Sequence, residues 1–412
     1  MRSFSGRVGR SAVAVIALFT IVVAIFTAGA YMGARNPEGL PGPIRDRVID
    51  PEGIGAINEA FGLIQDLYRE APKDRKLVDD AIGGMVDGLD DRFSTYLDPK
   101  EYARFNEAQD NRFEGIGVVV RQDPKGLLIT EVYKGSPAKE AGLRADDLIV
   151  QADEHELKGL TADQASRHVR GPANTKVRLV IERPDGKATR RLRITSGRDR
   201  VEVPIVDSRL ERKGGTPVGI VRLAQFTNDA ALNVARELQK MKKRGAKRFV
   251  LDLRSNPGGL VTEAQALASL FLKGGTVVTL RGRTVGEQTF PAGDDPIFPD
   301  EPLVVLVDRG SASAAEIVTG ALQDRDRATV VGTNTYGKGV FQRVVPLSSG
   351  GAVDITAGQY FTPKNRNLGG KGSDRGTGLA PDVRAKDDPK TTDRNEALDR
   401  AVTEARKLKD PR

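Results

Sequence analysis

The chain has 412 residues and a formal net charge of +8, and it contains no cysteine, no tryptophan and only two histidines, His155 and His168. This length predicts two to four domains. The lack of cysteine excludes disulfides, thiolate metal sites and thiol nucleophiles. Two histidines leave little room for a histidine-rich metal centre or a Ser–His–Asp triad. We therefore expect any acid–base catalysis to use Lys, Asp or Glu, with no metal and no organic cofactor.

The positive charge lies at the two ends of the chain. Residues 1–10 hold three arginines and no acid, and residues 361–412 hold 13 basic and 9 acidic residues. The body between them is therefore nearly neutral, and aromatic residues make up only 5% of the chain. A nucleic-acid groove needs clustered basic side chains with stacking aromatics, so we expect no nucleic-acid partner.

The first 35 residues predict export from the cytoplasm. An uncharged run, residues 11–34, follows the three arginines and is long enough to cross a bilayer core of about 30 Å. The arginines favour the cytoplasmic side. We expect residues 11–34 to anchor the protein in the inner membrane, with the rest of the chain on the periplasmic side of the envelope. A cleaved signal peptide is the alternative, because Ala28, Gly29 and Ala30 offer a small-residue cleavage site.

Residues 36–110 predict a small helical domain. Apolar residues recur at spacings of three and four in residues 57–68 and again in residues 77–89. These apolar stripes fit a core or the contact of a possible homodimer.

Residues 111–197 alternate short strands with two short helices. Strands are expected at 115–120 and 127–132, followed by the helix in SPAKEAGL and later by the helix in TADQASRHV. This order resembles a PDZ domain. The resemblance implies that a substrate with a free C-terminus pairs as an added strand, while its carboxylate meets the backbone of a loop. The residues of that loop are Gly115, Ile116, Gly117 and Val118.

Residues 198–386 repeat a pattern of apolar strand, glycine- or serine-containing turn, and helix. The helices are expected at 228–244, 260–272 and 313–325, which predicts an α/β domain with buried strands. The tail, residues 387–412, is charged and has a weak helical periodicity. The fold class is therefore a multi-domain α+β protein.

Ser313 lies where a predicted strand turns into a helix. Taken alone, Ser313 and Glu316 also fit a capping box, in which the two residues satisfy the first N–H groups of the helix. Lys338 follows 25 residues later between two glycines and is the remaining base able to activate a hydroxyl. Gln342 is placed to hold the lysine amine by a hydrogen bond. An ordinary lysine pKa of about 10.4 must fall to about 7–8 for this task, so Lys338 must be buried and free of any paired carboxylate.

A serine nucleophile also needs donors for an oxyanion. The turn at residues 255–259 follows a buried strand and opens a helix, so its backbone N–H groups can receive an anion. A tight turn is the simpler reading of its two glycines. The N–H of Ala314 or of Ser313, at the next helix start, is the second candidate donor.

These motifs together resemble the carboxy-terminal processing proteases, which are exported serine endopeptidases with a Ser–Lys dyad. The resemblance covers residues 55–385 and rests on SASAAE, YGKGVFQ, LRSNPGG and ITAGQYFTPKNR. It implies a crotonase- or Clp-like protease core, with the PDZ domain controlling access to the active site. It also implies roles for single residues: nucleophile Ser313, base Lys338, third member Gln342, oxyanion donor Gly258, and a PDZ arginine that switches the site, for which Arg170 is the candidate.

Two features depart from the family pattern. Ala315 stands where the family often has a third serine, and residues 364–380 are longer and richer in glycine than expected.

Two other functions remain open on the sequence. A non-catalytic PDZ adaptor or holdase would keep the fold but would have little reason to keep Ser313, Lys338 and Gln342 together. An acyl-CoA enzyme of crotonase type would explain neither the PDZ domain nor the export segment.

Overall fold

The computed structural model describes residues 51–409 except 71, 187, 371–373 and 389–394. The predicted membrane segment, residues 11–34, lies outside the described residues. The chain divides into two compact units, residues 1–82 and 83–412. No helix in the described part of the chain is long and apolar enough to span a bilayer.

The first unit contains α3 (Pro51–Leu67) and most of α4 (Asp74–Asp87), close to the helices expected from periodicity. Several apolar side chains on α3 are exposed, among them Ile57, Leu63 and Ile64. A homodimer contact through this stripe stays a prediction.

The expectation of an all-helical segment over residues 36–110 is wrong at one point. β1 (Thr95–Leu97) is a strand that pairs antiparallel with β18 (Ala352–Phe361). Three residues are too few to show a periodicity of two, which is why the pattern did not reveal the strand. β1 leads into α5 (Pro99–Asp110), which begins with Asp98 accepting hydrogen bonds from two backbone N–H groups of the first turn.

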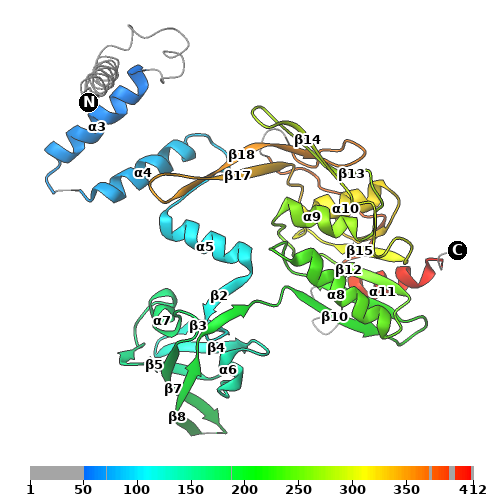
Figure 1. The fold of residues 1–412 in the computed structure, drawn as a ribbon, viewed down its shortest axis with the longest axis horizontal. Coiled ribbons are helices and arrows are strands. Elements are labelled where there is room, and N and C mark those ends of the chain that lie inside the picture. Colours follow the sequence, from blue (N-terminus) through cyan, green and yellow to red (C-terminus); the bar gives the residue numbers. More distant parts are fainter. Residues whose placement is uncertain (1–50, 71, 187, 371–373, 389–394, 410–412) are drawn as a thin grey trace, which may run out of the picture. The chain divides into compact units, whose positions relative to one another are not determined.

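An antiparallel sheet in the second unit forms the PDZ fold (Figure 1), in the strand order β3-β4-β5-β7-β8 with β6 beside β5. Its strands are β3 (Val118–Asp123), β4 (Gly126–Val132), β5 (Leu148–Ala152), β6 (His155–Glu156), β7 (Lys176–Asp185) and β8 (Ala188–Gly197). Its helices are α6 (Pro137–Glu140) and α7 (Ala162–Val169). A separate pair, β2 (Arg112–Gly115) and β9 (Asp199–Glu202), precedes and follows this sheet along the chain.

The prediction of one continuous strand over residues 115–120 is wrong, because the strand is interrupted between β2 and β3. Gly117 has φ +84°, and a Cβ at this position would lie 2.3 Å from Cβ of Ser136. Only glycine fits both the backbone angle and this close approach. The break leaves β3 at the edge of the sheet, where a further strand can pair.

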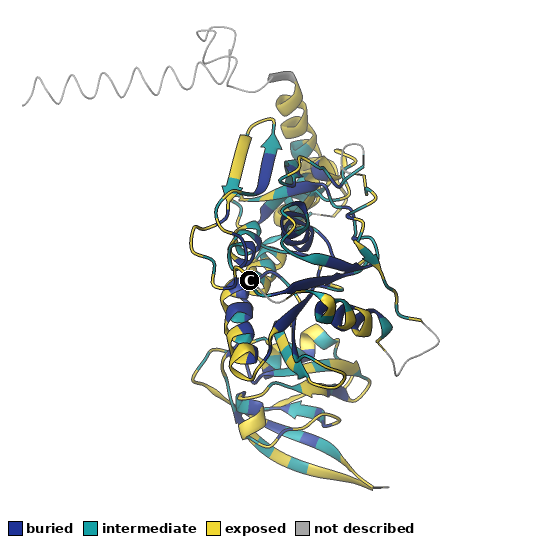
Figure 2. Ribbon diagram, turned by 90° about the vertical axis from the view of Figure 1, so that its right-hand side faces the viewer, coloured by how far each residue is buried: buried dark blue, intermediate teal, exposed yellow. Residues whose placement is uncertain are grey.

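A six-stranded sheet forms the centre of the remaining part, with order β10-β11-β12-β15-β16-β19. Its strands are β10 (Val206–Glu211), β11 (Val218–Leu223), β12 (Arg248–Asp252), β15 (Leu303–Val307), β16 (Thr329–Gly332) and β19 (Val383–Arg384), all parallel except β10. Every residue of β12 and β15 is buried, as expected for parallel strands covered on both faces (Figure 2).

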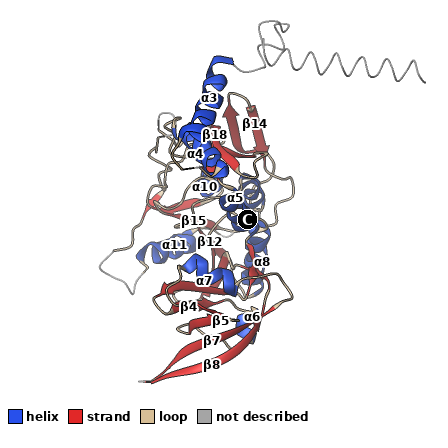
Figure 3. Ribbon diagram, turned by 90° about the vertical axis from the view of Figure 1, so that its left-hand side faces the viewer, coloured by secondary structure: helices blue, strands red, loops and turns tan. Residues whose placement is uncertain are grey.

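Helices cover both faces of this sheet (Figure 3). One face packs against α8 (Ala230–Lys243), α9 (Val261–Ser269) and α10 (Ala314–Asp324), and the other packs against α11 (Glu396–Lys407). The weakly periodic tail therefore forms a helix with a buried face. Because β12, β15 and β16 are parallel, the loops that follow them leave the same edge of the sheet, which is where α/β proteins form their sites.

A second sheet, entirely antiparallel, was not foreseen in full. It has the order β1-β18-β13-β14, with β17 also paired to β18. The predicted strand at VFQRVV is β17 (Val340–Pro346), while β13 (Thr276–Gly282) and β14 (Gly286–Pro291) form a hairpin that the strand–helix pattern did not predict. This sheet matters for function because β17 follows directly on the loop of Lys338.

Candidate active site

Ser313 is held in a strained backbone conformation at the turn between β15 and α10. Its φ of +54° and ψ of −116° are rarely adopted by a residue with a side chain, and such strain is common at functional turns. The preceding N–H, of Ala312, donates to the backbone oxygen of Asn256 at 2.9 Å. The N–H of Ser313 donates to Oε2 of Glu316 at 2.9 Å, as the capping pattern predicts. The turn is therefore fixed from two sides, and the Ser313 side chain is half-buried.

The Glu316 carboxylate does much more than cap a helix. It is fully buried and accepts five hydrogen bonds from segments that are distant in sequence. Besides the Ser313 N–H, the donors are the Thr335 hydroxyl at 2.6 Å, the N–H groups of Gly337 at 2.7 Å and Lys338 at 3.0 Å, and the Tyr360 hydroxyl at 3.2 Å. Burial raises the pKa of the Glu316 carboxyl, and the hydrogen bonds from Thr335 and the backbone act against this rise. One side chain thus joins the backbone of the predicted nucleophile to that of the predicted base.

Lys338 is half-buried, and its amine lies 4.9 Å from the centre of the Phe93 ring. Burial lowers the pKa of Lys338, while the charges of Asp354, Glu316 and Asp91 oppose this change. No ion pair and no hydrogen bond to the Ser313 hydroxyl is found for the amine within the described residues. The expected burial of Lys338 is thus partial in this conformation, and the dyad hydrogen bond is not formed in it.

Gln342 does not hold the lysine amine as expected. Its side-chain amide donates instead to the Thr356 hydroxyl at 3.2 Å, because β17 and β18 place Gln342 directly opposite Thr356. Gln342 still faces the cavity that contains Ser313 and Lys338.

Gly258 lies against the nucleophile turn. A Cβ at Gly258 would be 2.7 Å from Cβ of Ser313 and 2.9 Å from the nitrogen of Ala314, and its φ is +100°. However, the Gly258 N–H donates to Oδ1 of Asn256 at 2.9 Å, so it is engaged in the described conformation. Ala314 is the first residue of α10, a position whose N–H has no partner within the helix. The Ala314 N–H thus satisfies the requirement for an oxyanion donor more directly than the Gly258 N–H does.

These residues surround one cavity of about 700 Å³. Ser313, Lys338 and Gln342 line it together with residues from α5, from the turn after β12 and from the β17–β18 ribbon; among them are Phe105, Asp110, Pro257, Leu260, Phe341 and Asp354. Within the described residues, no group of three or more His, Asp or Glu side chains is placed to hold a metal ion.

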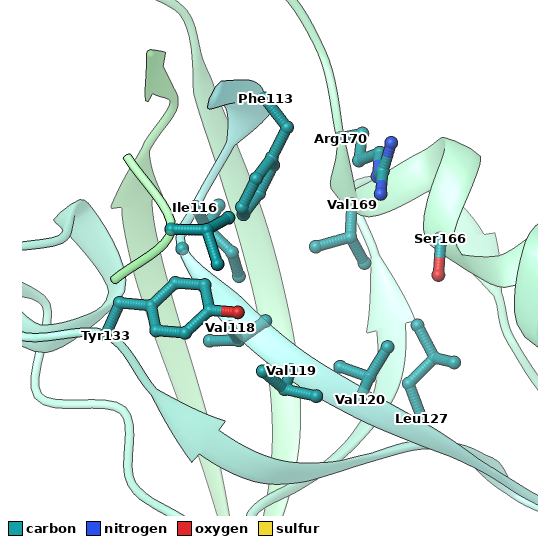
Figure 4. A pocket seen from close by; sticks show the side chains of 12 residues that line it. Phe113, Ile116, Val118, Val119, Val120, Leu127, Tyr133, Ser166, Val169 and Arg170 are labelled. Atoms are coloured by element: carbon teal, nitrogen blue, oxygen red, sulfur yellow. The ribbon is translucent and has the colours of Figure 1, made fainter. Parts of the chain in front are cut away.

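A second cavity, of about 340 Å³, lies in the PDZ fold between β3 and α7 (Figure 4). Three of the four predicted loop residues line it, namely Ile116, Gly117 and Val118, whereas Gly115 belongs to the end of β2. Arg170, directly after α7, also lines this cavity; its guanidinium lies 5.4 Å from the Phe113 ring centre and donates to Glu107 of α5 at 3.3 Å. The two histidines stack on each other in the PDZ fold with ring centres 4.2 Å apart, and neither lines the Ser313 cavity.

The comparisons with known proteins agree with this architecture. Residues 217–385 match Peptidase family S41, residues 128–183 match the PDZ domain family, and residues 44–101 match the activating protease CtpB N-terminal domain. A carboxy-terminal-processing protease of Bartonella bacilliformis is 33% identical over 335 residues, which cover 80% of this chain and 74% of that protein. A carboxyl-terminal-processing protease of a Synechocystis species is 36% identical over 315 residues, covering 76% and 73%. The solved structure of a photosystem II D1 C-terminal processing protease has 29% identity and a TM-score of 0.47, over 81% of this chain and 87% of that one.

The fold and these matches define a serine peptidase that carries a PDZ domain. The chain belongs to the carboxy-terminal processing proteases of peptidase family S41.

Several residues around the site were missed by sequence reasoning. Phe93, in the turn before β1, and Asp354, on β18, both approach Lys338. Asn256 joins two turns through its side chain and backbone. The alternating pattern of AVDITAGQY was the available signal for Asp354, since it places this acid two residues from Thr356 on the same face of a strand. Nothing in the sequence around Phe93 shows its contact with Lys338.

We expect Glu316→Gln to destabilise the protein and to impair peptidase activity together. An amide offers one acceptor oxygen and presents its own N–H groups to five donors, so several buried donors lose their partner. At about 1–3 kcal/mol for each unsatisfied buried group, the free energy of unfolding should fall by roughly 2–5 kcal/mol. Urea unfolding followed by circular dichroism measures this loss.

The matched control is Glu287→Gln, which removes a surface carboxylate paired with Arg281. Exposed ion pairs contribute about 0–1 kcal/mol, so this variant should unfold like the wild type. Equal stability and activity of Glu316→Gln and the wild type would contradict the central role of Glu316.

Proposed function

We propose that this protein cleaves polypeptides near their C-termini by acyl transfer, with Ser313 as nucleophile and Lys338 as general base. One observation carries the proposal: both side chains line the same cavity, and Glu316 binds the backbone N–H groups of both residues. The family membership supplies the peptidase activity, and the shared cavity supports Ser313 and Lys338 as the residues that perform it.

In the proposed reaction the neutral amine of Lys338 takes the proton of the Ser313 hydroxyl while Oγ attacks the carbonyl carbon of the scissile bond. The tetrahedral intermediate collapses to an ester on Ser313, and the leaving amine takes the proton from Lys338. Water then attacks the ester and gives one proton to Lys338, which returns it to Oγ as the new carboxylic acid leaves and loses its remaining proton to solvent. The Ala314 N–H stabilises the oxyanion, and the Gly258 N–H joins it when the substrate oxygen replaces Oδ1 of Asn256.

Catalysis requires the Lys338 amine to leave the Phe93 ring and approach Ser313. The ring face favours the charged ammonium, whereas the reaction requires the neutral amine. The described conformation therefore fits a resting state better than a reacting one.

We further propose that the PDZ groove receives the substrate C-terminus and that Arg170 reports its binding to the protease core. The support is the position of Arg170: it lines the groove and bonds to Glu107 of α5, a helix whose residues Phe105 and Asp110 line the Ser313 cavity.

The proposed place of action is the envelope, with residues 11–34 as the membrane anchor. The support for this location is the arginine-flanked apolar run in the sequence.

The dyad is tested by cleavage of a peptide that carries a free apolar C-terminus. Ser313→Ala and Lys338→Ala should each lower kcat/KM by on the order of 10³-fold or more, because members of a catalytic unit fail together. Lys273→Ala, at an exposed lysine, is the control and should cleave like the wild type. Equal cleavage by all variants would exclude the dyad, and no cleavage by the wild type would favour a non-catalytic adaptor.

The pH dependence tests the surroundings of Lys338. Its neutral fraction grows as the pH rises through the lysine pKa, so kcat/KM should rise with pH, with a midpoint below the ordinary value of about 10.4. Phe93→Leu keeps an apolar cover but removes an attraction for the ammonium of about 0.5–2 kcal/mol, which should move the midpoint down by roughly 0.4–1.5 pH units. The control is Phe361→Leu, where the lost ring faces Arg281 instead. A midpoint that rises or stays unchanged in Phe93→Leu would contradict this account.

Arg170→Ala tests the regulatory proposal. The variant should retain the basal cleavage of a short peptide but lose the stimulation that a second, PDZ-binding peptide produces in the wild type. The matched control is Arg167→Ala, an exposed arginine in α7, the helix that ends just before Arg170. Full stimulation of Arg170→Ala would remove this residue from the proposal.

A further inference from the structure

The β17–β18 ribbon presents one acidic side chain to the Ser313 cavity. In the strand register, Val344 lies opposite Asp354 and Gln342 lies opposite Thr356. Side chains two residues apart point to the same face of a strand, and Gln342, Val344 and Asp354 indeed all line the cavity. Asp354 thus shares a cavity with the nucleophile and the base without belonging to the dyad.

The Asp354 side chain is half-buried, and one oxygen of its carboxylate lacks a donor in the described part of the chain. Its Oδ1 is buried and has no hydrogen-bond partner among the described residues. A buried carboxylate is costly unless a cation or several donors compensate for its lost hydration. Burial and the charge of Asp91 raise the pKa of Asp354, and Lys338 is the cation that opposes this rise.

Lys338 cannot compensate Asp354 during catalysis, because its amine must then be neutral. The other charged residue lining the cavity is Asp110 of α5, whose Oδ1 accepts a hydrogen bond from the Asn228 amide at 2.9 Å. Gln109, also on α5, adds an amide oxygen that is buried without a partner in the described part of the chain. The working cavity is therefore rich in acceptors and contains no permanent cation.

The remaining walls fit the stem of a long basic side chain. Phe105, Leu260, Val261, Phe341 and Val344 are apolar and line the same cavity of about 700 Å³. Lysine and arginine bury their methylene stems against apolar surface and place the charged end beside an acceptor.

We propose that Asp354 makes the catalytic cavity a subsite for a basic side chain, so that the enzyme prefers substrates with lysine or arginine next to the scissile bond. This inference rests on the proposed peptidase activity of Ser313 and Lys338. It assigns to Asp354 a role in substrate choice, in addition to its electrostatic effect on Lys338.

The same arrangement couples substrate binding to the state of the base. Asp354, Asp91 and Glu316 each favour the charged form of Lys338, and Phe93 does so through its ring. A basic substrate side chain neutralises Asp354 and adds a positive charge beside Lys338, and both changes favour the neutral amine. A basic substrate is thus expected to bind well and also to raise the fraction of Lys338 that is neutral at a given pH.

The test compares full-length wild type, Asp354→Asn and the control Asp207→Asn, an exposed acid on β10 away from the cavity. Each enzyme receives two series of peptides that share one C-terminal tail. One series varies the residue before the cleaved bond and the other varies the residue after it, in each case as Lys, Arg, norleucine or Gln. The wild type and Asp207→Asn should cleave the better-placed Lys or Arg peptide at least about tenfold faster in kcat/KM than the norleucine peptide. Asp354→Asn should lose this preference and retain cleavage of the norleucine peptide.

A second readout separates selection from a general effect on Lys338. In the wild type, the acidic limb of kcat, which reports the base in the enzyme–substrate complex, should lie at lower pH with the Lys peptide than with the norleucine peptide, and in Asp354→Asn the two limbs should coincide. If wild type cleaves the norleucine peptide but shows no basic preference, the inference fails and the peptidase proposal stands. If the preference survives in Asp354→Asn, Asp354 is not its cause. Loss of all cleavage by the wild type would instead overturn the peptidase proposal.

Discussion

The buried carboxylate of Glu316 is the constraint on which the active site depends. It accepts hydrogen bonds from Ser313 at the start of α10, from Thr335, Gly337 and Lys338 in the loop after β16, and from Tyr360 at the end of β18. These segments cannot separate without leaving a buried charge or buried donors unpaired. The backbones of Ser313 and Lys338 are therefore fixed relative to each other, and the freedom that remains lies in the lysine side chain. In the proposed mechanism, a change between resting and reacting states needs only a movement of that side chain from the Phe93 ring toward Ser313.

The amine of Lys338 is subject to opposing influences, of which burial is the largest and lowers its pKa. Burial favours its neutral form, while three carboxylates and one aromatic face favour its charged form. One pKa unit corresponds to about 1.4 kcal/mol, which is comparable to a single hydrogen bond or cation–π contact. A single added or neutralised charge in the cavity is therefore enough to change the fraction of active base. On the proposed mechanism, the charge of the substrate would therefore matter to the chemical step as well as to binding.

Much of the fold and the centre of the site could be predicted from the sequence, because both depend on local patterns. Helices such as α8 and α10 and buried strands such as β12 follow from periodicity. Ser313 and Lys338 were singled out by the shortage of other bases and by the family resemblance, and the structure brings both to one cavity. What failed depends on contacts between distant segments. β1 is too short to have a pattern, and its identity as a strand comes from its partner β18. The expected bond from Gln342 to Lys338 failed because strand register placed Thr356 opposite Gln342. Likewise, Oδ1 of Asn256 accepts a hydrogen bond from the Gly258 N–H, a contact that residue spacing alone does not reveal.

The helix α5 shows how substrate sensing and catalysis can share one element. Toward the PDZ fold, Glu107 receives a hydrogen bond from Arg170, and Arg104 forms an ion pair with Asp163 of α7. At its C-terminal end, the backbone oxygen of Gln109 and the carboxylate of Asp110 bind Asn228, and both residues line the Ser313 cavity. The contacts toward α7 are exposed and weak, whereas those at the cavity involve backbone and a side-chain amide. In the proposed regulation, a peptide that competes for Arg170 in the PDZ groove would release one end of α5 without unfolding it. The acceptor-rich wall of the cavity, which includes Gln109 and Asp110, is the part of the active site that such a release would reach first.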